Sequence, residues 1–275
     1  MVVLPFVASK TVEVRLNEGG RRVITGDRVF LDVGSHAAIP RYPGPCGCKT
    51  HDSRGRSRSR PFAGTRDCTG WGVRGPELAQ ALRHFGSAVT VIELGRQIAG
   101  GEDPDVAQAL LENFTGEGIE VLLERRVREV EGSPVRRSEF VLKTATENKR
   151  SREPICWSLS DGRRTPRGWG WKRQESNWTR GYIKVNERLE TTATGVWAMG
   201  DCAGSPQFTH VAFDDFRVVR NNLSGGSRTT RDRLIPFCML ADPELARVGL
   251  NESEGKRRAS DIAWRRCPWP RYCEP

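Results

Sequence analysis

A short apolar run that ends in Gly-Asp constrains the fold more than any other part of the chain. Val196–Met199 has the length and composition of a buried strand, and Gly200-Asp201 ends it before a loop of small residues. In an open α/β sheet, ligands bind at the carboxyl ends of the strands. We therefore predict that Asp201 lies in a binding site, where its carboxylate accepts hydrogen bonds from sugar-like hydroxyls.

The residues around this strand resemble a known cofactor motif. Thr192–Ala212 contains a threonine, a turn glycine, an apolar strand and Gly-Asp, as does the second flavin-binding motif of the class I pyridine nucleotide-disulfide oxidoreductases, among them mercuric reductase and dihydrolipoamide dehydrogenase. The resemblance continues through Phe213–Arg217 and Val248–Leu250. It implies an α/β fold with doubly wound, Rossmann-like FAD- and NAD(P)-binding domains, here incomplete, and the first part of an α+β dimer-interface domain.

The same resemblance implies flavin-binding roles for individual residues. Asp201 would hold the ribityl chain of FAD, and the backbone near Thr209 would approach the flavin ring. No proton-transfer role is implied for His210, and no residue is predicted to be catalytic. The predicted flavin-binding residues are Gly200, Asp201, Gln207, Phe208, Thr209 and His210.

A glycine-rich turn predicts a second nucleotide site. Gly70, Gly72 and Gly75 have the G-x-G-x-x-G spacing and precede a helical segment and the strand Val89–Ile92. In a dinucleotide-binding fold the glycines let the backbone approach the pyrophosphate, and an acidic residue about 20 positions on binds the ribose. Glu93 is that acid, and it favours NADH over NADPH because a carboxylate repels a 2′-phosphate.

Apolar spacing predicts two helices in this region. The helix at 76–86 begins with proline and ends at glycine. Within it, the family resemblance implies that Glu77 lies near the nicotinamide, and the alternative is an exposed helix carboxylate. Its expected inner face is Leu78, Ala81, Leu82 and Phe85. Asp103 is expected to cap a second helix, before a strand at 119–123. The inner face of that helix is expected to be Val106, Ala109, Leu110 and Phe114.

Three segments have no readable period and are predicted to be degraded. The strand expected before the glycine-rich turn, Thr65–Thr69, is polar and unsuited to a central parallel strand. Read one frame over with plausible GC-rich codons, Cys68–Gly75, Cys156–Arg164 and Ile262–Pro275 all regain family-like patterns. We hypothesise that these stretches are out of frame relative to an intact ancestor, which the codons of the encoding DNA would test.

The predicted organisation alternates between family-like and degraded segments. We expect the chain to begin part-way into the FAD-binding domain and to stop before the interface domain is complete. The predicted divisions are a remnant of the first half of the FAD-binding domain at 1–44, an unstructured segment at 45–69, the NAD(P)-binding domain at 70–145, a degraded segment at 146–180, the second half of the FAD-binding domain at 181–226, the start of the dimerisation domain at 227–258 and a degraded tail at 259–275.

The basic charge and the cysteines do not favour another class. Net charge is +10, but arginines concentrate in the segments without periodicity, so we expect no nucleic acid partner. The eight cysteines show neither the family's redox spacing nor secretory context. Cys46 and Cys48 near His51 lack a second ligand pair, so no metal site is predicted, and Cys202 is expected to be a small buried thiol.

These observations predict an NAD(P)H-dependent flavoprotein oxidoreductase. It would pass hydride from NAD(P)H to FAD and then to a disulfide, metal-ion or other small-molecule acceptor, with poor activity of this chain alone. No stretch predicts a secretory signal or a membrane span, so we expect a cytoplasmic protein that is a homodimer in intact relatives. The alternatives are a non-catalytic nucleotide-binding or dimer-interaction remnant of the family and, with less support, a basic RNA-binding protein.

Overall fold

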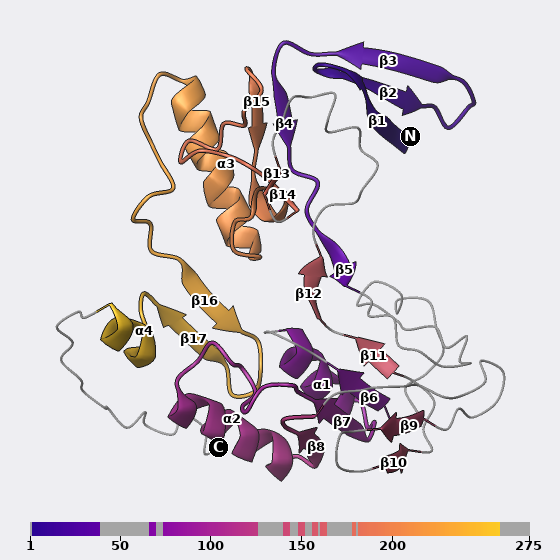
Figure 1. The fold of residues 1–275 in the computed structure, drawn as a ribbon, viewed down its shortest axis with the longest axis vertical. Helices are drawn as coiled ribbons and strands as arrows, with labels where there is room; N and C mark the ends of the chain where they lie inside the picture. The colour runs from indigo at the N-terminus through magenta and orange to yellow at the C-terminus, as the bar shows by residue number, and fades with distance from the viewer. Residues whose placement is uncertain are drawn as a thin grey trace, which may run out of the picture. The chain divides into compact units, whose positions relative to one another are not determined.

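The computed structural model describes nine stretches of the chain, which form two compact units. The stretches are residues 2–38, 66–69, 74–125, 140–143, 148–151, 156–158, 160–163, 178–179 and 181–258. Residues 2–38 and 181–235 belong to the first unit, and residues 66–69, 74–125 and 236–258 belong to the second. Figure 1 shows the elements of both, and each unit is described by itself.

The first unit is built around a parallel pair of strands from distant parts of the sequence. β4 (Val29–Leu31) and β15 (Val196–Ala198) pair in parallel, with Val29 opposite Val196 and Leu31 opposite Ala198. The Met199 N–H continues the ladder by donating to the Leu31 carbonyl at 3.0 Å. The apolar run predicted before Gly-Asp is therefore a buried strand.

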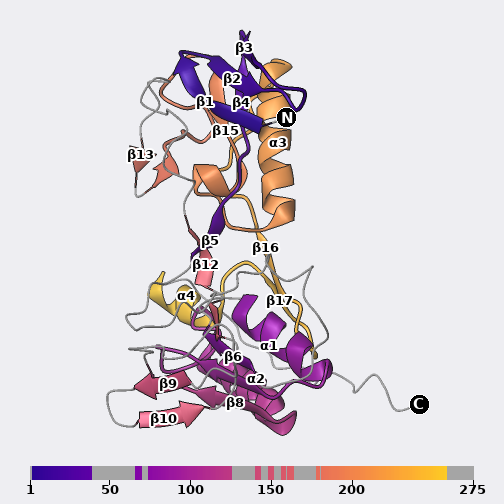
Figure 2. The same cartoon turned by 90° about the vertical axis from the view of Figure 1, so that its right-hand side faces the viewer.

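The two faces of β15 pack against different layers, because side chains alternate along a strand. Val196 and Ala198 join Phe6, Leu31 and Ile183 in one buried cluster. The opposite face contributes Trp197 and Met199 to a cluster with Val218 and Val219. The latter two belong to α3 (Thr209–Leu223), which Figure 2 shows running beside β15 and β4.

A three-stranded antiparallel sheet completes the other side of this core. The sheet consists, in order, of β1 (Val2–Ala8), β2 (Thr11–Arg15) and β3 (Arg21–Thr25). Phe6 of β1 belongs to the same buried cluster as Leu31 of β4. The strand β1 is not among those that the sequence predicts. Short pairs join β5 (His36–Ala38) with β12 (Ser160–Arg163) and β13 (Trp178–Thr179) with β14 (Tyr182–Ile183).

The second unit contains the parallel sheet of a dinucleotide-binding fold. Its strand order is β11-β6-β7-β8, and β6, β7 and β8 pair in parallel. Two helices connect these strands, as expected from the alternating pattern. The elements are β6 (Arg66–Thr69), α1 (Arg74–His84), β7 (Val89–Ile92), α2 (Pro104–Gly116), β8 (Ile119–Leu122) and β11 (Cys156–Ser158).

Strands also form within the segments predicted to be unstructured (45–69) or degraded (146–180). Arg66–Thr69 is β6, an interior strand of the parallel sheet, despite its polar sequence. β10 (Asn148–Ser151) pairs with β9 (Phe140–Lys143), and β11, β12 and β13 also fall within residues 146–180. Backbone hydrogen bonds form a sheet ladder whatever the side chains are, so pairing with β7 holds β6 in place.

The helices are where the sequence predicts them, but their buried faces differ. In α1 the buried residues include Ala79, Gln80 and Leu82, whereas Phe85 lies just beyond the helix and is 62% exposed. In α2, Ala107 is buried in place of Ala109, while Leu110 and Phe114 are buried as predicted. Both inner faces are thus rotated slightly from the face that apolar spacing alone predicts.

The chain closes the second unit with a hairpin and a short helix. β16 (Pro236–Met239) pairs antiparallel with β17 (Leu245–Val248), and α4 (Glu252–Arg257) follows. Gln80 attaches α1 to the turn of this hairpin through both ends of its amide. Its Nε2 donates to the Asp242 carbonyl at 2.6 Å, and its Oε1 accepts from the Asp242 N–H at 2.7 Å.

Asp103 does not cap α2 with its side chain as predicted. It has the extended backbone of an N-cap residue, but its carboxylate makes no capping bond to its own helix. Instead it accepts from the Glu252 N–H at 2.9 Å, the Ser253 N–H at 3.0 Å and the Ser253 hydroxyl at 2.6 Å. These bonds fix the start of α4, and the Ser253 hydroxyl is the main reason that the pKa of Asp103 is lowered.

Candidate functional site

The candidate site lies where β4 and β15 end together. Because the strands are parallel and in register, the residues that follow them reach the same edge of the sheet. Gly200 and Asp201 begin a short 3₁₀ helix, η2 (Gly200–Ala203). Ser35, in the segment that follows β4, donates its hydroxyl hydrogen to Asp201 Oδ2 at 2.6 Å. The structure thus places the predicted flavin ligand at the carboxyl end of a parallel strand pair.

Gly200 lies where a larger residue would be crowded. Its φ is +65°, a conformation that favours glycine. A Cβ built there would lie 3.0 Å from Asp32 Oδ1 and 3.2 Å from the Ala212 Cβ. The glycine of the Gly-Asp pair is therefore needed both for the turn and for the close approach of β4 and α3.

Carboxylates gather around this turn. The pKa of Asp32 is raised, first by partial burial and then by repulsion from Asp201 and Asp215, although much of the Asp32 residue is exposed. Asp215 is fully buried, and its Oδ2 accepts from the Gly200 N–H at 2.8 Å. A bound molecule that offers hydroxyl donors suits this edge better than an anionic one, because a carboxylate accepts hydrogen bonds.

Cys202 is a structural residue of the same turn. Its side chain is fully buried, and the thiol hydrogen faces the Leu31 carbonyl at 3.3 Å and the Met199 carbonyl at 3.2 Å from Sγ. Burial raises the pKa of the thiol, so the nucleophilic thiolate is disfavoured. The prediction of a small buried cysteine is confirmed.

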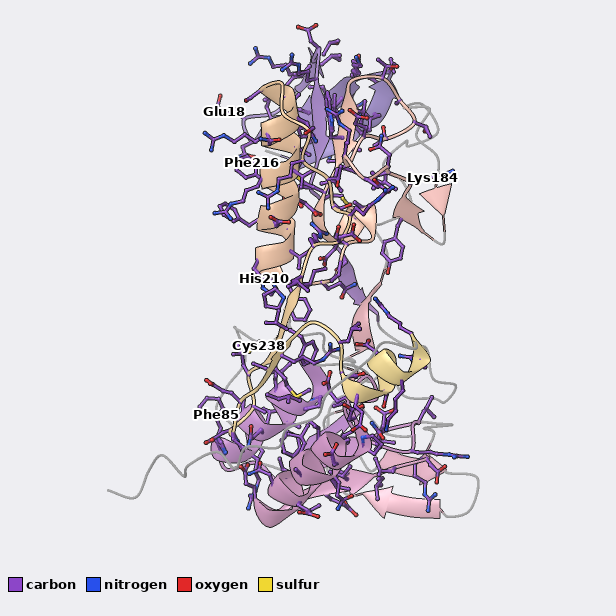
Figure 3. The ribbon with its side chains drawn as sticks, turned by 90° about the vertical axis from the view of Figure 1, so that its left-hand side faces the viewer. Glu18, Phe85, Lys184, His210, Phe216 and Cys238 are labelled. Atoms are coloured by element: carbon purple, nitrogen blue, oxygen red, sulfur yellow. The ribbon has the colours of Figure 1, made fainter. Side chains whose placement is uncertain are left out.

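The other predicted flavin-binding residues surround the start of α3. Gln207 and Phe208 are half-buried, whereas Thr209 and His210 are exposed. Phe208 is the N-cap residue, and its side chain makes no capping hydrogen bond. Figure 3 shows His210 at the end of α3, and its ring stacks on that of Phe208 with centroids 5.1 Å apart. A helix N-terminus carries partial positive charge and backbone donors, which suit the polar edge of a ring system.

The predicted dinucleotide residues lie in the second unit. Gly70 and Gly72 fall outside the described residues, and Gly75 is buried in the first turn of α1. Glu93 directly follows β7, as an acid that binds a ribose should. Its backbone continues the ladder to β8, and its Oε1 accepts from the Gly95 N–H at 2.7 Å.

Glu77 has a contact that sequence reasoning does not predict. Its Oε1 accepts from the Leu240 N–H at 2.7 Å, at the end of β16. Together with Gln80 it joins α1 to the hairpin. The structure therefore gives Glu77 a packing partner within the second unit.

Sequence reasoning about individual roles misses four site residues of the first unit. They are Asp32, Ser35, Ser205 and Arg233. Asp215 enters that reasoning only as part of the family-like stretch Phe213–Arg217. A usable signal is present, because Val211, Asp215, Val218 and Val219 follow helical spacing and Asp215 therefore occupies a core position.

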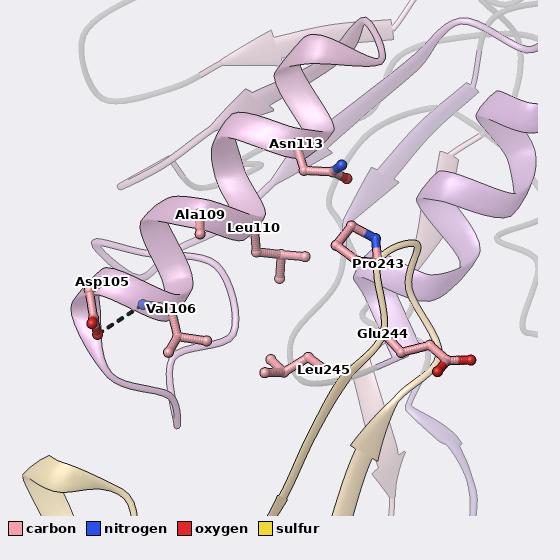
Figure 4. Close-up of a pocket in the computed structure, with 8 residues that line it drawn as sticks. All are labelled: Asp105, Val106, Ala109, Leu110, Asn113, Pro243, Glu244 and Leu245. Atoms are coloured by element: carbon pink, nitrogen blue, oxygen red, sulfur yellow. Dashed lines mark hydrogen bonds between the residues drawn. The ribbon is translucent and has the colours of Figure 1, made fainter. Parts of the chain in front are cut away.

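An apolar pocket of about 340 Å³ lies elsewhere, between α2 and the β16–β17 hairpin (Figure 4). None of the predicted cofactor-binding residues lines it. The lining residues are Asp105, Val106, Ala109, Leu110, Asn113, Pro243, Glu244 and Leu245. Within the described stretches no group of three or more His, Cys, Asp or Glu side chains is arranged to hold a metal ion.

Comparison with known proteins identifies the family. Residues 4–215 match the family model described as pyridine nucleotide-disulphide oxidoreductase. The chain belongs to this family. The pyridine nucleotide-disulphide oxidoreductase assignment covers most of the chain and includes both the Gly-Asp turn and the β6–α1–β7 segment.

Individual members of the family agree in sequence and fold. The chain is 31% identical to the probable pyridine nucleotide-disulfide oxidoreductase RclA of Escherichia coli K12, over 94% of this chain and 58% of RclA. It is 30% identical to the mercuric reductase of Acidithiobacillus ferrooxidans, over 92% of this chain and 45% of that enzyme. The chain thus spans about half the length of these relatives.

A solved structure shows the same arrangement of elements. The Cu(II) complex of the HOCl-induced flavoprotein disulfide reductase RclA from Escherichia coli superposes with a TM-score of 0.84 at 27% identity. The match covers 94% of this chain and 58% of that one. Of the helices in the described residues, none is long and apolar enough to cross a membrane.

Proposed function

We propose that this chain carries the flavin- and nicotinamide-binding parts of an NAD(P)H-dependent flavoprotein oxidoreductase. The observation that carries the proposal is Asp201, which follows β15 and whose carboxylate accepts a hydrogen bond from Ser35, in the segment after the parallel strand β4. Family membership supports it independently. When bound, FAD would supply the two-electron chemistry between a nicotinamide and the acceptor.

The residues of the first unit fit a flavin. Asp201 would accept hydrogen bonds from ribityl hydroxyls, and Ser35 would orient its carboxylate. The start of α3, with Gln207, Phe208, Thr209 and His210, would offer backbone donors to the flavin ring. Because Gly200 has no Cβ, the Asp201 turn can lie close to the ends of the strands.

The residues of the second unit fit NADH. Gly70, Gly72 and Gly75 would admit the pyrophosphate at the start of α1, and Glu93 would bind the ribose hydroxyls from the end of β7. A carboxylate there disfavours the additional phosphate of NADPH. Electrons would leave to a disulfide, a metal ion or another small acceptor, and we propose a homodimer. Leu240, 71% exposed, and Val248, 61% exposed, give the β16–β17 hairpin apolar surface for such an interface.

Flavin titration of the purified chain tests the proposal. FAD and riboflavin, which shares the ribityl chain and ring but lacks ADP, are added separately and visible absorption is recorded. We expect a bound flavin whose absorbance is bleached anaerobically by NADH more readily than by NADPH. Asp201→Ala is the site variant, and Asp105→Ala, on the exposed surface of α2, is the control.

The outcomes separate the competing functions. Flavin that binds to the wild-type chain and to Asp105→Ala, and much less to Asp201→Ala, supports the proposal. A folded chain that binds NADH but neither flavin would contradict it and favour a non-catalytic nucleotide-binding remnant. Salt-sensitive retention of RNA without nucleotide binding would favour the third alternative.

A further inference from the structure

Asp215 is a buried carboxylate that the flavin contacts do not use. It lies in the middle of α3, is 0% exposed, and shares its helix face with Val211, Val218 and Val219. A carboxylate in such a position is costly unless its oxygens are hydrogen-bonded and its charge is paired. The hydrogen-bond partners of Asp215 therefore indicate its role.

Both oxygens of Asp215 are occupied by groups from other segments. Oδ2 accepts from the Gly200 N–H at 2.8 Å and from the Ser205 hydroxyl at 2.7 Å. Oδ1 accepts from Arg233 Nη1 at 2.6 Å, and the Arg233 side chain is only 16% exposed. One carboxylate thus joins α3, the loop that contains Asp201 and the segment that precedes β16.

The contact with Gly200 acts directly on the flavin site. Gly200 is the residue before Asp201, so its N–H bond sets where the turn leaves β15. The Asp201 side chain is held independently by Ser35, from the segment between β4 and β5. Asp201 is consequently held at two points, through its side chain by Ser35 and through the preceding peptide by Asp215 of α3.

We infer that Asp215, paired with Arg233, is a positioning residue that sets the Gly200–Asp201 turn for the ribityl chain of a flavin. The inference rests on the proposed function. Loss of the Asp215 carboxylate should weaken flavin binding by roughly 10–100-fold, the range seen when a group that orients a metal ligand is removed. Asp215 would act through Asp201 and would not touch the cofactor.

Asp214 provides a matched control for this inference. It is adjacent on α3, and its Oδ2 also accepts from Arg233 Nη1, at 3.2 Å, while Oδ1 accepts from Arg228 at 2.7 Å. Its carboxylate thus faces the two arginines instead of the turn, and the residue is half-buried. Asp214→Asn therefore removes the same charge beside the same arginine without removing a bond to Gly200.

A double-mutant cycle on flavin affinity tests the inference. FAD binding is measured for the wild type, Asp215→Asn, Asp201→Asn and the double variant, with NADH binding by the second unit as the control for folding. We expect Asp215→Asn to weaken FAD binding at least tenfold and to alter the bound flavin's visible band. In the Asp201→Asn background the same change should cost less than threefold, because coupled residues are not additive. Asp214→Asn should change FAD affinity less than threefold.

Other outcomes overturn the inference separately from the proposed function. A folded Asp215→Asn that binds FAD like the wild type, or an equal loss in both backgrounds, would overturn the positioning role while leaving the flavin site intact. A wild-type chain that binds no flavin defeats the proposed function itself. If Asp215→Asn does not fold, Ser205→Ala takes its place in the cycle, because it removes another donor to Asp215 Oδ2. We expect Ser205→Ala to weaken FAD binding several-fold in the wild-type background and not in the Asp201→Asn background. Equal losses of FAD affinity in the two backgrounds would contradict the positioning role.

Discussion

At the scale of the residue, Gly200 carries an unusually tight combination of backbone conformation and packing. Its positive φ costs any other L-residue roughly 1–2 kcal/mol. The Asp32 carboxylate, 3.0 Å from an added Cβ, is exposed and can turn aside, whereas the Ala212 Cβ at 3.2 Å belongs to α3 and can retreat only if the helix shifts. A single methyl here would disturb the turn that presents Asp201.

We expect Gly200→Ala to lower the free energy of unfolding by about 2–4 kcal/mol, combining backbone strain with overpacking. Chemical denaturation measures the loss. Gly225→Ala is the control, because Gly225 has φ +87° and no atom within 4 Å of an added Cβ. It should lose only the roughly 1–2 kcal/mol of backbone strain. Equal losses in the two variants would show that crowding at Gly200 is unimportant.

At the same scale, the sequence predicts Asp201 but not the residues that hold it. The Gly-Asp pair is a local pattern, and its meaning depends only on the strand before it. Ser35 and Arg233 reach the site from other parts of the chain, and no local pattern announces a partner 166 positions away, the separation of Ser35 from Asp201. The burial of Asp215 can be predicted from the sequence, because Asp215 occupies a position of the apolar face of α3.

At the scale of the element, helix starts are easier to predict than helix faces. Pro104 and the glycines after Phe114 indicate the bounds of α2, and they depend on local backbone chemistry. The buried face of α1 instead depends on Gln80, whose amide bonds to the Asp242 backbone offset its burial. A polar residue buried against a distant turn breaks the apolar spacing on which the prediction relies.

The start of α4 provides a pH-dependent prediction. Bonding to α4 lowers the pKa of Asp103 from its ordinary 3.8, so its contribution to stability is present above that value and is lost as pH falls through the lowered pKa. We expect the wild type to lose stability on acidification below about pH 3.8 more steeply than Asp103→Asn does. Denaturation curves from pH 2 to 6, about the range over which carboxylates titrate, measure this.

Asp105→Asn is the control for this prediction, because it makes the same change two residues away on the exposed side of α2. Its pH dependence should follow the wild type. The same acid profile for Asp103→Asn and the wild type would contradict the assignment of the effect to α4.

At the scale of the whole molecule, the two cofactors are proposed to bind in different units. A ligand that binds only the folded state stabilises it by about 2.7 kcal/mol at 100 times its Kd. We expect FAD to slow amide hydrogen exchange in β4, β15 and η2, and NADH to slow it in β7 and the start of α1. Mass spectrometry of peptides from each unit measures the protection. FAD protection confined to the second unit would contradict the assignment of cofactors.

The parallel pair of β4 and β15 also has a consequence for how the protein is made. Ser35 is synthesised 166 residues before the aspartate that it orients. At the usual 5–20 residues per second, roughly 10–30 s separate the emergence of the two. Until then the strand that ends near Ser35 has no parallel neighbour, while β6, β7 and β8 have all left the ribosome. The β6–β7–β8 sheet is therefore free to form first, whereas the β4–β15 pair must wait for its second strand.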